Sequence, residues 1–484
     1  MMTEERRRPA STSRRWWVLS IVCSAMFMAV LDSTSVYTAL PAIARDLGFA
    51  PEGIQWVITA YGVSIGGLLL LGGRLADHLG ARRTFLLSTA AFAAASLACG
   101  LAGSAEALIA ARIAQGVGAA VMTPAGMSVL MQAFPDGPDR HRALGIWGGL
   151  GGTGATVGLL AGGALTEWAG WSWIFLTNVP VCVVVLLLSP ALLPHGARTT
   201  QPLDLPGALT ATAALVLALL AVFRLAGHGI DATSMGCAIG AAIAGALFVL
   251  IELRGTAPLV PPRIFSAGTV LGGNLVIVIA GIAVDGLLLV VTLYAQQVLG
   301  FTALQFGLSM VIMTVTSVLG VALGQHLVSR TGVRLVASLG MIMLTISCLM
   351  LSRLTVGGSL VEDLLAGLIV FGAGTGAAFV AGQIAALNGV DARDSGLAAG
   401  LAETSFAVGT TLGAALAAAI VTGVATRAAD GVPTISALTD GLAVALAVLA
   451  AVAALGVLCA VTLLRTPPAA PAPADRTDRS VRAS

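Results

Sequence analysis

Charged side chains are scarce in this sequence, and lysine is missing altogether. Asp, Glu, Lys and Arg make up 10% of the 484 residues, whereas hydrophobic residues make up 57%. Soluble globular domains carry about 25% charged residues, so the composition excludes a soluble globule of this size. We therefore expect an all-α polytopic membrane protein whose solvent is the lipid bilayer. The use of arginine alone, with abundant alanine and glycine, suggests a high-GC bacterial genome.

Signatures of catalysis and of cofactor binding are missing as well. The six cysteines are scattered without paired spacing, so we interpret them as small buried hydrophobic residues and not as disulfides or metal ligands. The sequence has no phosphate-binding loop of the G-x4-G-K-[ST] type, which argues against ATP-driven export. We expect no enzyme activity, no cofactor, no metal site and no nucleic-acid partner.

Most of the sequence consists of hydrophobic runs that are long enough to span a bilayer. A helix needs about 20 apolar residues to cross the hydrocarbon core. The predicted spans are residues 16–40, 55–76, 83–103, 106–133, 143–166, 173–193, 205–223, 232–252, 268–295, 303–326, 335–352, 363–388, 395–424 and 438–464. These are fourteen helices. The first is too long for a signal peptide, and the flanking tails are residues 1–15 and 466–484, of which the second is expected to be disordered.

The arginines are distributed unevenly between the two sides of these spans. With a cytoplasmic N-terminus, twenty of the 25 arginines fall in cytoplasmic segments, four fall in outer segments, and Arg112 lies within the membrane. The positive-inside rule therefore favours cytoplasmic N- and C-termini. The expected location is the inner membrane of a bacterial cell.

Three patterns in the first half of the chain return in the second half at offsets of 252 to 256 residues. They are the triplet Gly145, Gly154 and Gly158, the pair Gly116 and Gly118, and the loop 75–82, which return at Gly400, Gly409 and Gly413, at Gly372 and Gly374, and at 327–334. Three separate patterns that return at nearly the same offset indicate two similar six-helix bundles. We place these bundles at 16–194 and 264–465, with a two-helix linker at 195–263.

A glycine-rich stretch lies in the fifth predicted span, which carries no charge. On a helix, glycines four residues apart form one smooth stripe against which another helix can pack closely. The stretch carries Gly145, Gly154, Gly158, Gly162 and Gly163. This pattern resembles the fifth-helix antiporter motif of the major facilitator superfamily, except that Leu159 stands where the motif has proline. The alternative is an ordinary helix-packing face.

Two charged residues inside predicted spans are the first functional candidates. Asp32 lies about 21 Å into the first span and Arg112 about 9 Å into the fourth, which enters from the outer side, so both fall in the outer half of the membrane. A carboxylate at that depth is costly unless it is paired, protonated or facing water, so we infer one polar network that contains both residues. The alternatives are a purely structural aspartate and an arginine that extends to the outer interface.

The sequence around these two residues also carries a resemblance. The segments L-D-S-T-S-V-Y-T-A-L-P and A-R-I-A-Q-G-V-G-A-A, which contain Asp32 and Arg112, resemble motifs of the fourteen-span drug/proton antiporters. The resemblance implies that both residues take part in proton coupling. It extends to residues 168–180, whose tryptophans suit an outer interfacial belt.

The loop G-R-L-A-D-H-L-G-A-R-R at residues 73–83 resembles the most widespread signature of the superfamily. The resemblance implies a charge latch between the two halves, made of Gly73, Asp77, Gly80, Arg82 and Arg83. The second copy has Ser329 where Asp77 stands, so the latch is expected to be one-sided. The alternative is that the arginines only anchor the loop on the cytoplasmic side.

Three further residues are candidates for a substrate cavity. Asp285 is offset by 253 residues from Asp32, whereas the counterpart of Arg112 is Leu368. Glu403 is a second acid deep in a span, and Gln115 shares a helix face with Arg112. Acids in a cavity would favour cationic substrates or supply a second proton site. Each acid could instead hydrogen-bond a neighbouring helix.

The resemblance covers residues 31–464 and implies a complete function. It implies the major facilitator fold and export of drugs or antibiotics in exchange for protons by alternating access, by a functional monomer. The partners are then a small-molecule drug or antibiotic, protons and the lipid bilayer. The alternatives are an exporter of one endogenous metabolite, such as a self-made antibiotic, and a non-transporting sensor on the same fold.

Overall fold

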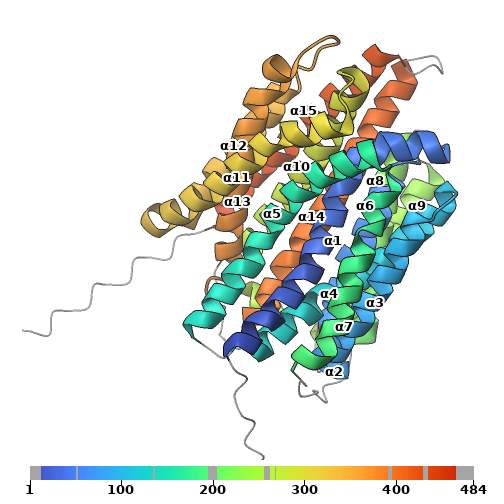
Figure 1. The fold of residues 1–484 in the computed structure, drawn as a ribbon. Helices are drawn as coiled ribbons and strands as arrows, with labels where there is room; N and C mark the ends of the chain where they lie inside the picture. The colour runs from blue at the N-terminus through green and yellow to red at the C-terminus, as the bar shows by residue number, and fades with distance from the viewer. Residues whose placement is uncertain are drawn as a thin grey trace, which may run out of the picture.

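A computed structural model describes residues 12–50, 53–134, 137–194, 204–229, 231–255, 262–266, 269–390, 395–428 and 434–464. All regular secondary structure in these ranges is helical, and the helices form one elongated bundle (Figure 1). The predicted C-terminal tail and residues 1–11 of the N-terminal tail lie outside the described residues.

The helices follow the predicted spans closely. The first part of the chain forms α1 (Thr12–Leu47), α2 (Trp56–Leu79), α3 (Ala81–Gly100), α4 (Ala105–Ala133), α5 (Pro138–Trp168), α6 (Ser172–Leu176), α7 (Asn178–Leu192), α8 (Leu205–His228) and α9 (Ala232–Arg254). The second part forms η1 (Pro262–Ser266), α10 (Val270–Leu293), η2 (Tyr294–Val298), α11 (Ala303–Thr331), α12 (Val333–Leu351), η3 (Leu360–Leu365), α13 (Ala366–Leu387), α14 (Ser395–Ala428) and α15 (Ile435–Leu463).

Eleven helical segments among the described residues are long and apolar enough to cross a membrane. Two shorter apolar segments lie in α2 and α8. Each predicted span overlaps a helix, with α6 and α7 together covering the sixth. The chain is thus a multi-span helical protein, and the number of fourteen spans stays a prediction.

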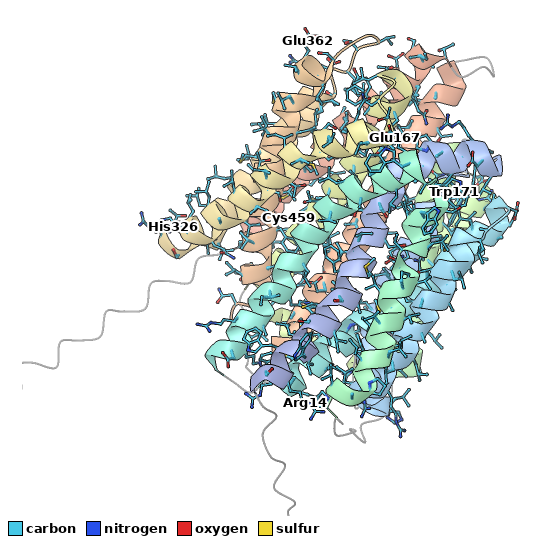
Figure 2. All side chains as sticks on the ribbon, in the orientation of Figure 1. Arg14, Glu167, Trp171, His326, Glu362 and Cys459 are labelled. Carbon is cyan, nitrogen blue, oxygen red and sulfur yellow. The ribbon has the colours of Figure 1, made fainter. Side chains whose placement is uncertain are left out.

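Arginines at one end of the bundle hold the last turn of α7. Arg14 donates hydrogen bonds to Ala191 O and Leu192 O at 3.1 and 3.3 Å, and Arg82 donates one to Pro190 O at 2.6 Å. These carbonyls have no partner within their own helix, and a cation there also offsets the helix dipole. We call the end that contains Arg14 the basic end, and the opposite end, which carries Glu167, Trp171 and Glu362, the far end (Figure 2).

Equivalent glycines make equivalent contacts in the two halves of the chain. Gly116 and Gly118 of α4 face the backbones of α2 and α3, at Tyr61 and Phe92. In the second half, Gly372 and Gly374 of α13 face α11 and α12 in the same way. The α2–α3 and α11–α12 turns also match, because each rests on a glycine with positive φ, 93° at Gly80 and 86° at Gly332.

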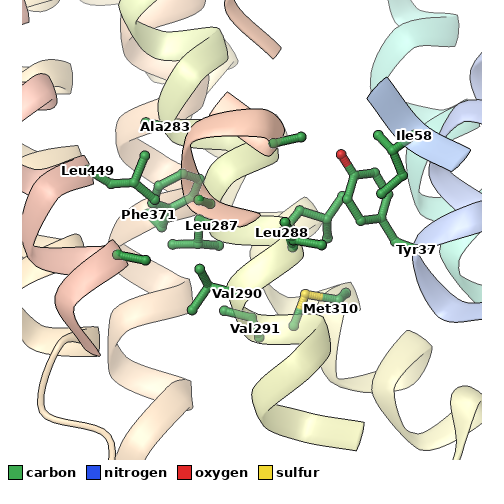
Figure 3. Close-up of a cluster of buried hydrophobic side chains, with 14 of the residues drawn as sticks. Tyr37, Ile58, Ala283, Leu287, Leu288, Val290, Val291, Met310, Phe371 and Leu449 are labelled. Atoms are coloured by element: carbon green, nitrogen blue, oxygen red, sulfur yellow. The ribbon is translucent and has the colours of Figure 1, made fainter. Parts of the chain in front are cut away.

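The largest apolar core joins the two halves at the far end and continues through the second half toward the basic end. The shared core includes Val36, Leu40, Leu159 and Phe175 from the first half and Leu288, Val291, Phe306 and Met310 from the second. Figure 3 shows Tyr37 and Ile58 of the first half beside Leu288 of the second. Nearer the basic end, a cluster around Phe85 and Phe134 contains first-half residues alone, and a cluster around Ile277 and Ala402 contains second-half residues alone. A small cluster on α8 connects α14 and α2 there. In Figure 1, α5 and α11 accordingly diverge toward the basic end.

Candidate functional site

The carboxylate of Asp32 lies on α1 among three hydrogen-bond donors. Its Oδ2 atom is 2.5 Å from Arg112 Nη1 of α4. Its Oδ1 atom accepts one hydrogen bond from Gln115 Nε2 at 2.8 Å and another from Asn178 Nδ2 of α7 at 2.8 Å. This set of donors suits the charged form of the carboxylate, because hydrogen bonds to an ionised acceptor are the stronger kind.

Arg112 is fixed by more than the ion pair. Its Nε atom donates to Val57 O at 2.8 Å, and Nη1 also donates to Gln115 Oε1 at 2.6 Å. The guanidinium lies 4.0 Å from the centroid of the Tyr61 ring. Tyr61 is held in turn by a hydrogen bond from its hydroxyl to Ala29 O at 3.2 Å. The planar guanidinium makes contacts in several directions that an ammonium group could not make at once.

A second layer of polar groups closes the network. Ser96 of α3 accepts a hydrogen bond from Gln115 Nε2 at 2.8 Å and a longer one from Asn178 Nδ2 at 3.4 Å. Asp32, Ser96, Gln115 and Asn178 are 0% exposed and Arg112 is 1% exposed, so solvent does not reach the pair. The whole network comes from α1, α2, α3, α4 and α7, and therefore from the first half alone.

The structure thus brings Asp32 and Arg112 into direct contact. The arginine does not extend to the membrane interface, so that alternative is wrong. Gln115 was expected to line a cavity, and the structure corrects this: its amide is fully buried and bonds Asp32, Ser96 and Arg112.

Sequence reasoning missed Asn178, Ser96 and Tyr61. Asn178 begins α7 directly after the break that follows α6, where the predicted span 173–193 overlaps the tryptophan-rich segment 168–180. An amide at the start of an apolar helix was a usable signal, because a buried amide requires partners. Ser96 and Tyr61 gave no such signal, since their role depends on α2 and α3 lying beside α4.

The glycine stretch of α5 packs against the segment of α1 that carries Asp32. Gly154 faces Val30, Gly158 faces Leu31 and Thr34, and Gly162 faces Ser35. A side chain at any of the three would collide with α1. Gly163 faces Ala303 of α11 in the other half, and Gly307 of α11 faces the backbone of Leu159. Gly145 also belongs to α5, but its surroundings lie outside the described residues.

Leu159, at the position of the motif's proline, has a structural role of its own. Its side chain is buried in the core shared by the two halves, and its carbonyl faces Gly307. The departure from the motif therefore adds apolar contact where α5 meets α11.

The loop 73–83 shows contacts within the first half. Gly80 makes the turn between α2 and α3, and Arg82 holds the end of α7. Gly73 lies on α2 near Pro124, and Arg83 is exposed. The side chain of Asp77 lies outside the described residues, so the predicted latch between the halves stays a prediction.

Asp285 and Glu403 lie inside the bundle and keep access to solvent. Asp285 of α10 is half-buried and interacts with the Tyr37 hydroxyl of α1. Glu403 of α14 lies among the other helices of the bundle, and solvent reaches its side chain. Neither acid forms an ion pair within the described part of the chain. Leu368, the counterpart of Arg112, is fully buried and supplies no charge.

The tryptophans near residue 170 divide into two kinds. Trp168 and Trp173 are exposed at the far end, as expected for an interfacial belt. Trp171 is buried, and its Nε1 atom donates to Asp46 Oδ2 of α1 at 2.9 Å. Trp171 thus differs from its two exposed neighbours, because its polar atom finds a partner inside the protein, and the interfacial belt stays a prediction.

Comparisons with known proteins agree with this architecture. The family model of the Major Facilitator Superfamily matches residues 22–273 and, a second time, residues 273–483. The cephamycin export protein CmcT of Amycolatopsis lactamdurans is 37% identical over 405 residues, which cover 82% of this chain and 83% of the relative. The multidrug resistance protein Stp of Mycobacterium tuberculosis (strain CDC 1551 / Oshkosh) is 31% identical over 404 residues, 82% of this chain and 74% of the relative.

Solved structures share the fold at low identity. A bacterial homologue of the human lysosomal transporter Spinster, in an inward-facing and unoccupied conformation, superposes with a TM-score of 0.64 at 16% identity. The match covers 95% of this chain and 100% of that structure. At this identity the similarity concerns the fold alone.

Proposed function

Since the chain belongs to the Major Facilitator Superfamily and its relatives export or resist antibiotics, we propose that it is a proton-coupled exporter of drugs or antibiotics. In this proposal a small-molecule drug or antibiotic leaves the cytoplasm while protons enter. The protein works as a monomer, and transport follows alternating access of a central site to the two sides of the membrane.

The membrane arrangement belongs to the same proposal. The basic end faces the cytoplasm, because the arginines concentrate there. Fourteen helices span the inner membrane of a bacterial cell, as two six-helix bundles at 16–194 and 264–465 and a linker at 195–263. The pairing of equivalent glycines in the two halves supports the two bundles, and the divergence of α5 and α11 toward the basic end fits a cavity open to the cytoplasm.

Asp32 and Arg112 form the proton-coupling pair in this mechanism. The carboxylate accepts hydrogen bonds from Arg112, Gln115 and Asn178, so a proton that reaches it has to displace one of these donors. The segment that carries Asp32 packs directly on α5, and α5 meets α11 of the other half through Gly163. A rocking motion of the two halves therefore acts on the surroundings of Asp32 through α5.

The membrane potential can supply the energy for such an exchange. One inward proton at 100 mV yields about 2.3 kcal/mol. For a neutral substrate exchanged one for one, this corresponds to roughly a fiftyfold concentration gradient.

One observation carries the proposal: a closed ion pair between two helices of the first half, in a transporter fold whose relatives export antibiotics. Everted membrane vesicles with an acidic interior provide the test. Candidate antibiotics and cationic dyes are added outside, and collapse of the pH gradient is followed by a fluorescent probe. We expect at least one compound to collapse the gradient with the wild type and none with Asp32→Asn.

A matched variant controls for loss of a carboxylate as such. Asp440 of α15 is exposed, so Asp440→Asn should couple like the wild type. Coupling that survives in Asp32→Asn would move the proton site to another acid. No response of the wild type to any compound, with normal ligand binding, would favour a non-transporting sensor.

Export of a single endogenous antibiotic is a second candidate, favoured by the similarity to the cephamycin export protein. The same vesicles decide between the two. A response to one structural class of antibiotic supports the narrow exporter, whereas responses to unrelated antibiotics and dyes support a multidrug exporter.

A further inference from the structure

Tyr37 places a hydroxyl in the apolar core between the two halves. The residue lies on α1, is 1% exposed, and sits beside Ile58 and Leu288 (Figure 3). Its hydroxyl has no hydrogen-bond partner of standard geometry in the described structure. Buried hydroxyls are rarely left in this state, so a functional reason is needed.

The group next to this hydroxyl is the carboxyl of Asp285, on α10 of the other half. Asp285 is half-buried and has no cation beside it in the described structure. The Tyr37 hydroxyl is therefore the polar side-chain group that faces the Asp285 carboxyl across the two halves.

Charged groups on the surrounding helices do not neutralise Asp285. Arg112 of α4 lies near enough to Tyr37 to act on it electrostatically, but its ion pair is with Asp32. Glu403 of α14 lies about ten residues nearer the basic end, roughly 15 Å along the helix, because Gly286 packs beside Gly413. Elsewhere on the described elements around α10, acids and bases occupy helix ends. These residues are Arg14, Arg15, Arg45 and Asp46 of α1, Arg263 of η1, Arg334 of α12, Glu362 and Asp363 of η3, Arg427 of α14 and Asp440 of α15.

A second polar contact joins the same two elements. Gln296 Nε2 of η2, which continues α10, donates to Thr38 O at 3.1 Å. Tyr37 and Thr38 thus both contact polar groups of the second half, five and six residues beyond Asp32 on α1. We call Tyr37, Thr38, Asp285 and Gln296 the α1–α10 clasp.

We propose that Asp285 is the carboxyl whose protonation controls closure of the far end, with Tyr37 as its hydrogen-bonding partner across the two halves. This inference rests on the proposed proton-coupled export. A proton from water at the far end binds a carboxylate oxygen of Asp285, and it later leaves to water at the basic end. No covalent bond to substrate forms.

The direction of the effect follows from desolvation. When the far end closes, α1 covers Asp285 and removes water from it, and a neutral carboxyl tolerates this far better than a charged one. Protonated Asp285 therefore favours the closed far end, and deprotonated Asp285 favours the open one. Asp32 differs, since three donors already hold its charge inside the protein.

Distances between spin labels across the far end test the proposal for the clasp and do not require a transported substrate. Spin labels are placed by Glu167→Cys and Glu362→Cys, at exposed sites on α5 and η3, in the full chain without its native cysteines and in lipid nanodiscs. In the wild type we expect the short distance at acidic pH and growth of a longer distance as the pH rises. Asp285→Asn should keep the short distance throughout.

Tyr37→Phe should shift the midpoint of opening to lower pH by about one unit, because the charged carboxyl loses the neighbouring hydroxyl, whose dipole helps it tolerate the closed state. The matched control is Thr292→Val. It removes a buried hydroxyl near the end of α10 that bonds its own helix at Leu288 O, and it should leave the midpoint unchanged.

Several results would overturn the clasp. They are an unchanged pH titration in Asp285→Asn, an unshifted midpoint in Tyr37→Phe, and an equal shift in Thr292→Val. If Asp285→Asn does not accumulate, Tyr37→Phe and its control decide alone.

The vesicle assay separates this inference from the proposed function. If the wild type couples and Asp285→Asn couples equally, the clasp is wrong and proton-coupled export stands. If no compound collapses the gradient while the labels titrate as expected, the export proposal fails and the clasp stands as a pH-dependent closure.

Discussion

At the scale of single residues, the buried pair of Asp32 and Arg112 depends on the hydrogen bonds around it. Charges in a bilayer-embedded interior are costly, and their attraction repays that cost only with good geometry and extra hydrogen bonds. Here Gln115, Asn178 and Val57 O supply those bonds. Loss of one partner leaves a buried charge uncompensated, whereas loss of both does not.

This argument predicts non-additive stability. Arg112→Gln alone should lower the free energy of unfolding by about 3–5 kcal/mol, because the Asp32 charge stays buried without its cation. The double variant Asp32→Asn with Arg112→Gln should recover most of that loss. Thermal unfolding in detergent, compared across wild type, both single variants and the double variant, measures the coupling. Losses that simply add would show that the pair contributes nothing as a pair.

Asn178 supports a second prediction. Asn178→Ala removes a donor to Asp32 from a site that solvent cannot reach, so we expect a loss of about 1–3 kcal/mol. The neighbouring Thr177 bonds its own helix at Ile174 O and is half-buried, so Thr177→Ala is the matched control and should cost less. Equal losses in the two variants would assign Asn178 to helix stability and not to the carboxylate.

The sequence identified the charged members of this site and missed the neutral ones. An acid or a base in an apolar run is conspicuous because burial of a charge is costly. Ser96 and Asn178 are ordinary residues for a membrane helix, and nothing in their local sequence says that α3 and α7 approach α1. Gln115 was placed on the correct helix face, but its exposure depends on how tightly α4 packs.

At the scale of helices, glycine contacts decide which surfaces approach one another. The stripe on α5 is matched by Gly409 and Gly413 of α14, which face the backbone of α10 at Val278 and Ile282. Gly400 repeats the spacing but has nothing within 4 Å of its missing side chain. Spacing alone cannot separate these cases, because the contact depends on the partner helix.

This difference gives a paired prediction. Gly158→Val should displace α1 around Leu31 and Thr34, cost about 1–3 kcal/mol and abolish drug-dependent collapse of the pH gradient. Gly400→Val makes the same change where space is available, so it should leave stability and transport near the wild type. If both variants behave alike, the loss reflects helix propensity and not contact with α1.

Helix positions were predictable to within a few residues, and helix irregularities were not. The break between α6 and α7 and the π-helical segments η2 and η3 leave the hydrophobic pattern almost unchanged. One extra residue in a turn alters side-chain direction without altering composition. Such features come from tertiary contacts, such as the hydrogen bond from the Tyr294 hydroxyl to Asp363 of η3.

At the scale of the whole molecule, the structure is closed at the far end, whereas toward the basic end α5 and α11 diverge and the halves meet through α2, α8 and α14. The closure depends on close approach of α5 and α11, where Gly307 meets Leu159 and Gly163 meets Ala303. Repeated glycine patterns in the sequence predicted the two halves. They did not predict the closed conformation, because it depends on contacts between residues about 150 positions apart.

A further prediction concerns this contact. Gly307→Val would press a side chain into the Leu159 backbone, so the far end should open and the distance between labels at 167 and 362 should lengthen at every pH. Leu308 is exposed beside it, and Leu308→Ala should leave the distance unchanged. A short distance in Gly307→Val would show that α5 and α11 separate freely without opening the far end.

The confinement of the Asp32 network to one half has a consequence for the energy landscape. A motion of one half against the other breaks none of its hydrogen bonds directly, and it reaches the network through the contact of α1 with α5. What must change at the interface are apolar contacts and the α1–α10 clasp, which are individually weak. Two conformations of similar free energy can then be shifted by a single proton or a modestly bound ligand.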